Sequence, residues 1–265
     1  MHAFTAQTHL ETAMTQEEQG ESDTTIVPLL QMGPYRVQHE TSAVPRLFSF
    51  LDGGASRTSA SSPPLLDLTS GYFSLYAPYK ALILACRNVA VRIITAAPQS
   101  NGFFMSRGIS GYVADAYTRM QIKFWEELKR AGRARVPAAQ EEKREQPTDA
   151  EVAPSVEIRE WKKQDWTYHA KGFWLTPAGE RLPQHTLIGS SNFGGRSARL
   201  DLECTLLVST SSPKLQQRLH GEVETLRKDA KDVFDDAFIE KERGKMGRRN
   251  TLFVKLGTWL IRKML

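Results

Sequence analysis

The sequence predicts an α/β domain in which a mixed sheet is flanked by helices, and two observations lead to this prediction. Strand-like apolar runs at residues 65–69 and 89–97 enclose a segment with helical periodicity, an order typical of a βαβ unit. Four further strand-like runs follow, at residues 156–161, 166–175, 185–189 and 202–209. With 265 residues and 40% hydrophobic content, the chain can bury one sizeable core.

The chain divides into three expected parts. Residues 1–24 are polar, acidic and aperiodic, so we expect a disordered acidic tail. Residues 25–243 are expected to form the α/β domain, with a Gly-, Ser- and Pro-rich loop at 52–64 and a solvated loop of mixed charge at 131–154. Residues 244–265 are expected to form a basic amphipathic segment that suits either a membrane surface or packing on another part of the protein.

Apolar clusters and helix signals predict the other elements of this domain. Residues 25–51 contain two apolar clusters that we expect to be a strand and a short helix. Apolar residues recur at helical spacing over residues 74–88 and 112–129. A last helix is expected to begin at Ser212-Pro213, because a capping hydroxyl followed by proline favours a helix start.

Charge and cysteine content limit the classes of function. The net charge of +5 and the pI of about 9.2 suit an anionic partner such as phospholipid headgroups. The mixed signs of the charged segments argue against a nucleic-acid arm. Cys86 and Cys204 have neither zinc-ligand nor disulfide spacing, and we expect both to be small buried residues. The sequence predicts no membrane-spanning helix, and its acidic start is unlike a transit peptide.

The second half of the chain contains a group of residues suited to phosphoryl chemistry. His169 and Lys171 are two apart on an expected strand, and such side chains point to the same face. The turn at residues 189–192 can bring small hydrogen-bond donors to the same point, and Gly189 would let the backbone approach a bound phosphate. A nucleophile, a fixed positive charge and neutral donors can act on a phosphodiester without a metal ion.

The spacing after this turn resembles the Gly-Ser-x-Asn-x-x-x-Arg-Ser-x-x-x-Asn-x-Glu pattern of the phospholipase D superfamily. The matching residues are Gly189, Ser190, Asn192, Arg196, Ser197 and Glu203. His169 and Lys171 match the His-x-Lys of the superfamily's HKD motif. Asp201 stands in place of the second Asn, and Thr176 stands in place of the Asp of the HKD motif. The resemblance implies a phospholipase D-like domain.

Longer runs resemble the eukaryotic phosphatidylglycerophosphate synthase family, the CDP-diacylglycerol–glycerol-3-phosphate 3-phosphatidyltransferases. These runs are residues 69–73, 101–104, 168–175, 187–194 and 254–265. The resemblance implies phosphatidyl transfer from CDP-diacylglycerol to glycerol 3-phosphate through a phosphohistidine intermediate, within the cardiolipin pathway. It also implies a mitochondrial, membrane-associated enzyme that acts at a membrane surface, needs no cofactor and binds no nucleic acid.

The resemblance further implies a role for each residue of the site. His169 would be the nucleophile or the general acid and base, while Lys171 and Asn192 would bind the non-bridging phosphate oxygens. Glu203 would accept a hydrogen bond from a catalytic imidazole and fix its orientation. The residues expected to bind substrate are Gly189, Ser190, Ser191, Arg196 and Ser197. No metal ligands are expected, because Lys171 supplies the positive charge.

One half of such a site is expected to come from outside this sequence. The superfamily builds one active site from two HKD motifs, and His169 is the one histidine here with a lysine two positions later. The second half would come from an N-terminal half of a longer protein or from a second copy of the chain. Two other interpretations stay open: a phospholipase D-type hydrolase that uses water as acceptor, and a non-catalytic half-site product that binds lipid or a partner.

Overall fold

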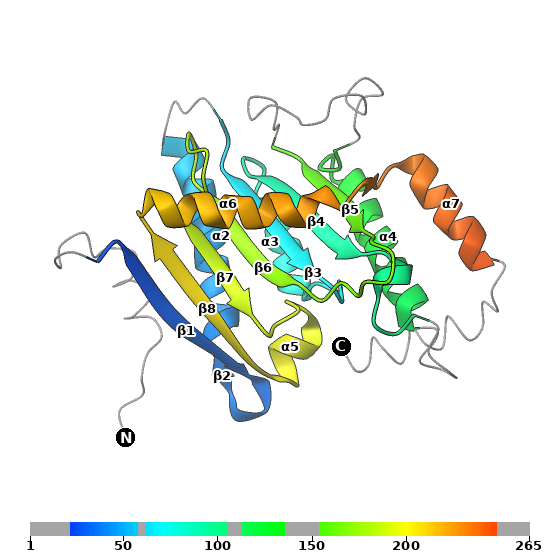
Figure 1. Ribbon diagram of the computed structural model, residues 1–265, viewed down its shortest axis with the longest axis horizontal. Helices are drawn as coiled ribbons and strands as arrows, with labels where there is room; N and C mark the ends of the chain where they lie inside the picture. The colour runs from blue at the N-terminus through cyan, green and yellow to red at the C-terminus, as the bar shows by residue number, and fades with distance from the viewer. Residues whose placement is uncertain (1–21, 58–61, 105–112, 136–153, 248–265) are drawn as a thin grey trace.

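A nine-stranded mixed sheet with helices on both faces forms the domain (Figure 1). The structure is a computed structural model that describes residues 22–57, 62–104, 113–135 and 154–247. The strands are β1 (Thr24–Met32), β2 (Val37–Gln38), β3 (Leu65–Ser70), β4 (Ala90–Ala96), β5 (Val156–Trp161), β6 (Lys171–Thr176), β7 (His185–Gly189), β8 (Leu202–Thr210) and β9 (Asp232–Val233). Their order across the sheet is β2-β1-β8-β7-β6-β3-β4-β5-β9.

The helices lie between and after these strands. They are η1 (Gly33–Tyr35), α2 (His39–Arg57), α3 (Ala77–Ala85), η2 (Pro98–Ser100), α4 (Val113–Arg130), α5 (Gly195–Arg199), α6 (Pro213–Lys228) and α7 (Asp236–Gly247). Strands β3, β4 and β5 are parallel, and the connections between them contain α3 and α4. The βαβ unit expected from residues 65–97 is therefore confirmed.

Two apolar layers hold the helices on the sheet. The main core lies between the sheet and α2, α3 and α4, where Leu47, Ile83 and Phe124 pack with strand residues such as Leu68 and Ile93. On the other face α6 crosses the sheet, as Figure 1 shows. There its residues Leu219 and Val223 pack on Trp174 of β6.

Strand register brings the expected site residues to one edge of the sheet. Ser70 at the end of β3 pairs with Lys171 at the start of β6. Gly189 at the end of β7 pairs with Thr205 near the start of β8. Because β6 runs antiparallel to both β3 and β7, the starts of β6 and β8 lie beside the ends of β3 and β7. The loops that carry the candidate residues leave the sheet at this shared edge.

Two expected element boundaries are wrong. Residues 52–57 do not belong to a loop, because α2 continues to Arg57. The strand expected at 166–175 begins only at Lys171. The chain before it leaves the ladder, because the backbone N–H of Tyr168 donates to the carbonyl oxygen of Ser100 at 2.8 Å. His169 therefore lies in the loop before β6 and not on a strand.

Two residues have the opposite burial from that expected, and one cap is missing. Cys204 is exposed, because Glu203 and Thr205 occupy the inward face of β8 on either side of it. Arg133 is buried just after the end of α4, where its guanidinium donates to the carbonyl oxygens of Val89 and Pro154 at 3.0 and 3.1 Å.

Helix α6 does begin after Ser212, but the Ser212 side chain makes no capping hydrogen bond.

Several expectations lie outside the described residues. These are the acidic tail up to residue 21, the loop between 136 and 153, and the amphipathic segment beyond 247. Helix α7 continues through the domain boundary expected at residue 243. Within the described ranges, no helix has both the length and the apolar content needed to cross a bilayer.

Candidate active site

His169 and Lys171 lie against the same aromatic ring. The His169 and Tyr72 ring centroids are 5.4 Å apart, with the rings nearly perpendicular, and the Lys171 Nζ lies 5.9 Å from the Tyr72 centroid. The Lys171 Nζ also donates to the backbone oxygen of His169 at 2.9 Å. The two side chains are therefore neighbours, as expected, although only Lys171 is on a strand.

The residue before His169 anchors this loop in the protein. The buried ring of Tyr168 lies 4.8 Å from that of Trp161, and its hydroxyl is hydrogen-bonded to that of Thr69. On the other side, Gly71 donates its N–H to the carbonyl oxygen of Ala170 at 3.1 Å. A Cβ atom at Gly71 would lie 2.6 Å from the Tyr168 carbonyl oxygen, so any larger residue would displace the loop that carries the histidine.

Glu203 holds the turn after β7 through two serine hydroxyls. Ser190 Oγ donates to one carboxylate oxygen at 2.5 Å, and Ser197 Oγ donates to the other at 2.7 Å. The N–H of Asn192 in turn donates to Ser197 Oγ at 3.2 Å. Within the described part of the chain both of its hydrogen bonds are to serines, and the role of Glu203 toward a catalytic imidazole stays a prediction. The carboxylate fixes Ser190 and Asn192 relative to β8.

Gly189 is required by the neighbouring strand. A Cβ atom there would lie 2.3 Å from the carbonyl oxygen of Cys204 and 2.6 Å from the Cα of Thr205. Such distances are far below van der Waals contact, so β7 and β8 can approach this closely only when residue 189 lacks a side chain. The approach of the Gly189 backbone to a phosphate stays a prediction.

Glu40 is a site residue that sequence reasoning missed. Its side chain is fully buried, and it accepts hydrogen bonds from Ser191 Oγ and Thr205 Oγ1, both at 3.0 Å, and from the Tyr79 hydroxyl at 3.3 Å. Burial raises the pKa of Glu40 to about 7. No local motif marks this residue. It reaches the turn because α2 packs behind β1 and β8.

The residues expected to bind substrate divide into two groups. Ser190 is exposed beside Glu203, whereas the hydroxyls of Ser191 and Ser197 are buried and donate to the carboxylates of Glu40 and Glu203. The first can contact a ligand directly, and the other two hold the turn in place.

Arg196 is exposed and forms an ion pair with Asp201. Its Nε donates to the Asp201 carboxylate at 2.8 Å. The departure from the family pattern at residue 201 therefore supplies a partner for the family's arginine. A substrate phosphate would have to compete with this carboxylate for the guanidinium.

Electrostatics favour a neutral imidazole at His169. Partial burial, followed by the positive charge of Lys171, lowers the pKa of His169 below its usual value. Burial also lowers the pKa of Lys171, and the charge of Glu203 opposes that shift. A neutral imidazole has a free nitrogen lone pair, which a nucleophile or a general base requires.

Asn192 has one unused hydrogen-bonding group. Its side-chain oxygen is buried and has no hydrogen-bond partner within the described part of the chain, while its backbone oxygen accepts from Ser70 Oγ at 3.1 Å. Buried polar atoms normally find a partner, so this amide is available to a bound molecule. Among the described residues, no three His, Cys, Asp or Glu side chains gather in a way that could hold a metal ion.

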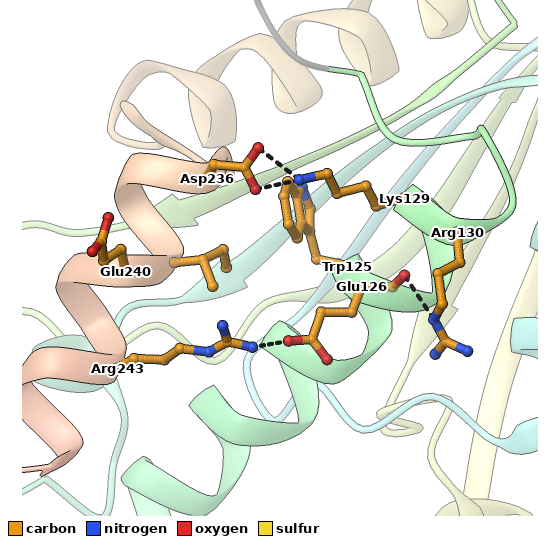
Figure 2. Close-up of a pocket in the computed structure, with 8 residues that line it drawn as sticks. Trp125, Glu126, Lys129, Arg130, Asp236, Glu240 and Arg243 are labelled. Atoms are coloured by element: carbon orange, nitrogen blue, oxygen red, sulfur yellow. Dashed lines mark hydrogen bonds and ion pairs between the residues drawn. The ribbon is translucent and has the colours of Figure 1, made fainter.

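A separate cavity of about 720 Å³ lies between α4 and α7 (Figure 2). Its charged walls pair with each other across the gap, through Lys129 with Asp236 at 2.5 Å and through Glu126 with Arg243. The Lys129 Nζ also lies 5.1 Å from the Trp125 ring centroid. None of the residues that line this cavity belongs to the cluster around His169, and its ion pairs connect α7 to the domain.

Comparison with known proteins gives a family and a set of relatives. The family model described as "Cardiolipin synthase, PLD-like domain" matches residues 60–227. The mitochondrial CDP-diacylglycerol–glycerol-3-phosphate 3-phosphatidyltransferase of Bos taurus is 35% identical over 99% of this chain and 42% of its own length. The Gallus gallus protein of the same name is 36% identical over 91% of this chain and 37% of its own length. The chain thus spans about two fifths of these relatives.

A solved structure supports the fold. The crystal structure of phosphatidylserine synthase from Haemophilus influenzae Rd KW20 aligns with a TM-score of 0.62 at 17% identity, covering 96% of this chain and 52% of that one. At this identity the likeness concerns the fold alone. Since the family model covers more than half of the chain and includes both His169 and the turn that Glu203 holds, the chain belongs to the family of cardiolipin synthase PLD-like domains.

Proposed function

We propose that this chain is one half of an enzyme that transfers a phosphatidyl group from CDP-diacylglycerol to glycerol 3-phosphate. The products are phosphatidylglycerol phosphate and CMP. The names of the relatives supply the reaction. The observation that carries the proposal is the shared position of His169 and Lys171 beside Tyr72, at the edge where the turn that Glu203 holds also ends. This edge offers a neutral imidazole, a positive charge and a fixed set of donors.

The reaction proceeds in two displacements at phosphorus. A nitrogen of one catalytic imidazole attacks the phosphorus of CDP-diacylglycerol, the bond to the CMP oxygen breaks, and a phosphatidyl-histidine forms. The other histidine of the pair protonates the departing CMP. That histidine then takes the proton of the glycerol 3-phosphate hydroxyl, whose oxygen attacks phosphorus and releases the imidazole. Each proton transfer of this kind contributes roughly 10²–10⁴-fold in rate.

The other site residues act on the charge at phosphorus. Lys171 and Asn192 bind the non-bridging oxygens, where negative charge develops during each displacement. Ser190 is exposed and adds a donor. Glu203 keeps this serine in place through the 2.5 Å hydrogen bond.

A second His-x-Lys half completes the site, and an exposed apolar face of the sheet provides a surface for it. Leu202, Cys204 and Leu206 alternate along β8 on the outward face, and the two leucines are 61% and 42% exposed. Ile188 of β7 pairs with Leu206 and is also exposed. We call these four residues the β8 strip. It lies beside Ser190, so a half that covers it would bring its own histidine near His169.

We also propose that the enzyme is mitochondrial and associated with the membrane. The names of the relatives include that organelle, and the lipid substrate resides in a bilayer. No cofactor enters the reaction as written, since each displacement exchanges one bond to phosphorus for another.

The test is a transfer assay with radiolabelled CDP-diacylglycerol and glycerol 3-phosphate. The chain is assayed alone and with an upstream half that bears its own His-x-Lys, beside His169→Ala and, as control, His220→Ala, a change at a half-buried histidine of α6. Labelled phosphatidylglycerol phosphate that is lost only with His169→Ala supports the proposal. Release of phosphatidic acid to water instead would indicate a hydrolase, and no reaction with the added half would indicate a non-catalytic protein.

A further inference from the structure

The loop between β5 and β6 presents a tryptophan and two lysines to solvent. All six residues at 162–167 are exposed, and Trp166 is 59% exposed. The Lys163 Nζ lies 4.2 Å from the Trp166 ring centroid, and the backbone N–H of Trp166 donates to the Lys163 carbonyl oxygen at 3.3 Å. The tryptophan is thus held outward in a local turn.

This loop adjoins the rim of the candidate site. A side chain at Gly102 would meet both the Tyr72 hydroxyl and the methyl group of Thr167, so the segment around Gly102 separates the loop from the site. Phe103, the next residue, is 37% exposed, and its ring lies 5.5 Å from that of Tyr72. Tyr72 in turn contacts His169. The exposed ring of Phe103 is therefore linked to the histidine through the ring of Tyr72.

We propose that residues 162–167, together with Phe103, form a surface that rests on a bilayer containing anionic phospholipids. The inference rests on the proposed function, because it assumes that His169 acts on a lipid. Tryptophan prefers the headgroup level of a membrane, where its apolar ring and its N–H are both accommodated. The scissile phosphate of a bilayer lipid lies at the same level. Trp166 is three residues before His169, so seating the loop there brings the imidazole to the phosphate.

The charges of the loop match an anionic surface. Lys162 and Lys163 outnumber the single carboxylate, Asp165. Each lysine near an anionic leaflet strengthens binding by about fivefold. A protein partner would more often cover its surface with buried apolar groups, whereas here the exposed Trp166 ring lies beside the Lys163 ammonium.

The experiment measures cosedimentation of the full chain with phosphatidylcholine vesicles, with and without phosphatidylglycerol. Trp166→Ala should weaken binding by about tenfold, because a large aromatic surface no longer leaves water. The double variant Lys162→Gln, Lys163→Gln should remove most of the dependence on phosphatidylglycerol. The matched control is Tyr35→Ala, since Tyr35 is a 71% exposed aromatic residue in η1, between β1 and β2 at the other edge of the sheet. It should bind like the unaltered chain.

A second measurement needs no change in the loop. Trp125, Trp161 and Trp174 are buried, so in a Trp259→Phe chain the exposed tryptophan is Trp166. Vesicles containing brominated lipid should quench its emission. Unchanged vesicle binding by Trp166→Ala, or emission that responds to CMP and not to vesicles, would overturn the proposal. Neither readout requires turnover, so a failed transfer assay and a failed membrane surface can be told apart.

Discussion

The buried carboxylate of Glu40 accepts a hydrogen bond from the Ser191 hydroxyl at 3.0 Å, which links helix α2 to the turn that carries Ser190 and Asn192. The same Oγ of Ser191 accepts from the N–H of Phe193 at 3.0 Å. Glu40 lies outside the part of the chain that matches the family model. The turn therefore depends on a residue from an element that precedes the matched region.

Replacing Glu40 should change how stability depends on pH. Burial raises the pKa of this carboxyl from 4.5 to about 7, so the unfolded chain releases the proton at lower pH than the folded chain does. Stability should therefore fall as pH rises from about 4.5 to about 7, by up to about 3 kcal/mol from this group. Glu40→Gln should flatten that part of the curve, measured by urea unfolding across the range.

The control for this prediction is Glu180→Gln, because Glu180 is exposed in the turn between β6 and β7. Burial also raises the pKa of Glu160, to about 8, and its contribution stays in both variants. The difference between the Glu40→Gln curve and that of the unaltered chain isolates Glu40. A constant difference across this pH range would show that Glu40 has an ordinary pKa.

Gly189→Ala should destabilise the domain, because its Cβ would overlap the backbone of β8 at 2.3 Å. Overpacking of this kind costs about 1–3 kcal/mol, measured as a shift in the urea midpoint. The matched control is Gly221→Ala in α6, where no atom lies within 4 Å of the added Cβ. That change should stabilise by up to about 1 kcal/mol, since alanine is the better helix former. Equal effects at both sites would contradict the packing argument.

Lys171→Gln should raise the pKa of His169. The lysine charge is the second cause of the depressed pKa, after partial burial, so its removal shifts the value toward normal without fully restoring it. The measurement is an NMR titration of the imidazole ring protons. His185 provides an internal reference, because burial alone lowers its pKa and its titration should not move. A His169 titration unaffected by the substitution would mean that the two side chains do not interact.

Leu206→Asp should weaken association with the second half of the site. Leu206 belongs to the β8 strip and pairs with Ile188, and an aspartate there would have to be desolvated on docking. Sedimentation of the chain, alone and mixed with the upstream half, would report the change. Lys231→Asp, which introduces the same residue at an exposed position beside β9, at the far edge of the sheet from β8, should leave association intact. Equal loss for both variants would place the interface elsewhere.

Local sequence patterns were enough to predict the elements whose signals are local. The βαβ unit and strands β5, β7 and β8 were predicted with small errors at their ends, because apolar periodicity and turn residues act over a few positions. The motif spacing also identified the residues that gather at one edge of the sheet. Motif spacing depends on covalent order, which the sequence states directly.

Tertiary structure alone decided which side of β8 is buried. In β8 the polar Glu203 and Thr205 face inward while Leu202 and Leu206 face solvent, the reverse of what hydrophobicity predicts. This inversion is possible because the inward carboxylate and hydroxyl find partners on distant segments. Such pairs join residues far apart in the chain, as Glu40 and Thr205 show, and only the folded backbone brings them within hydrogen-bond distance.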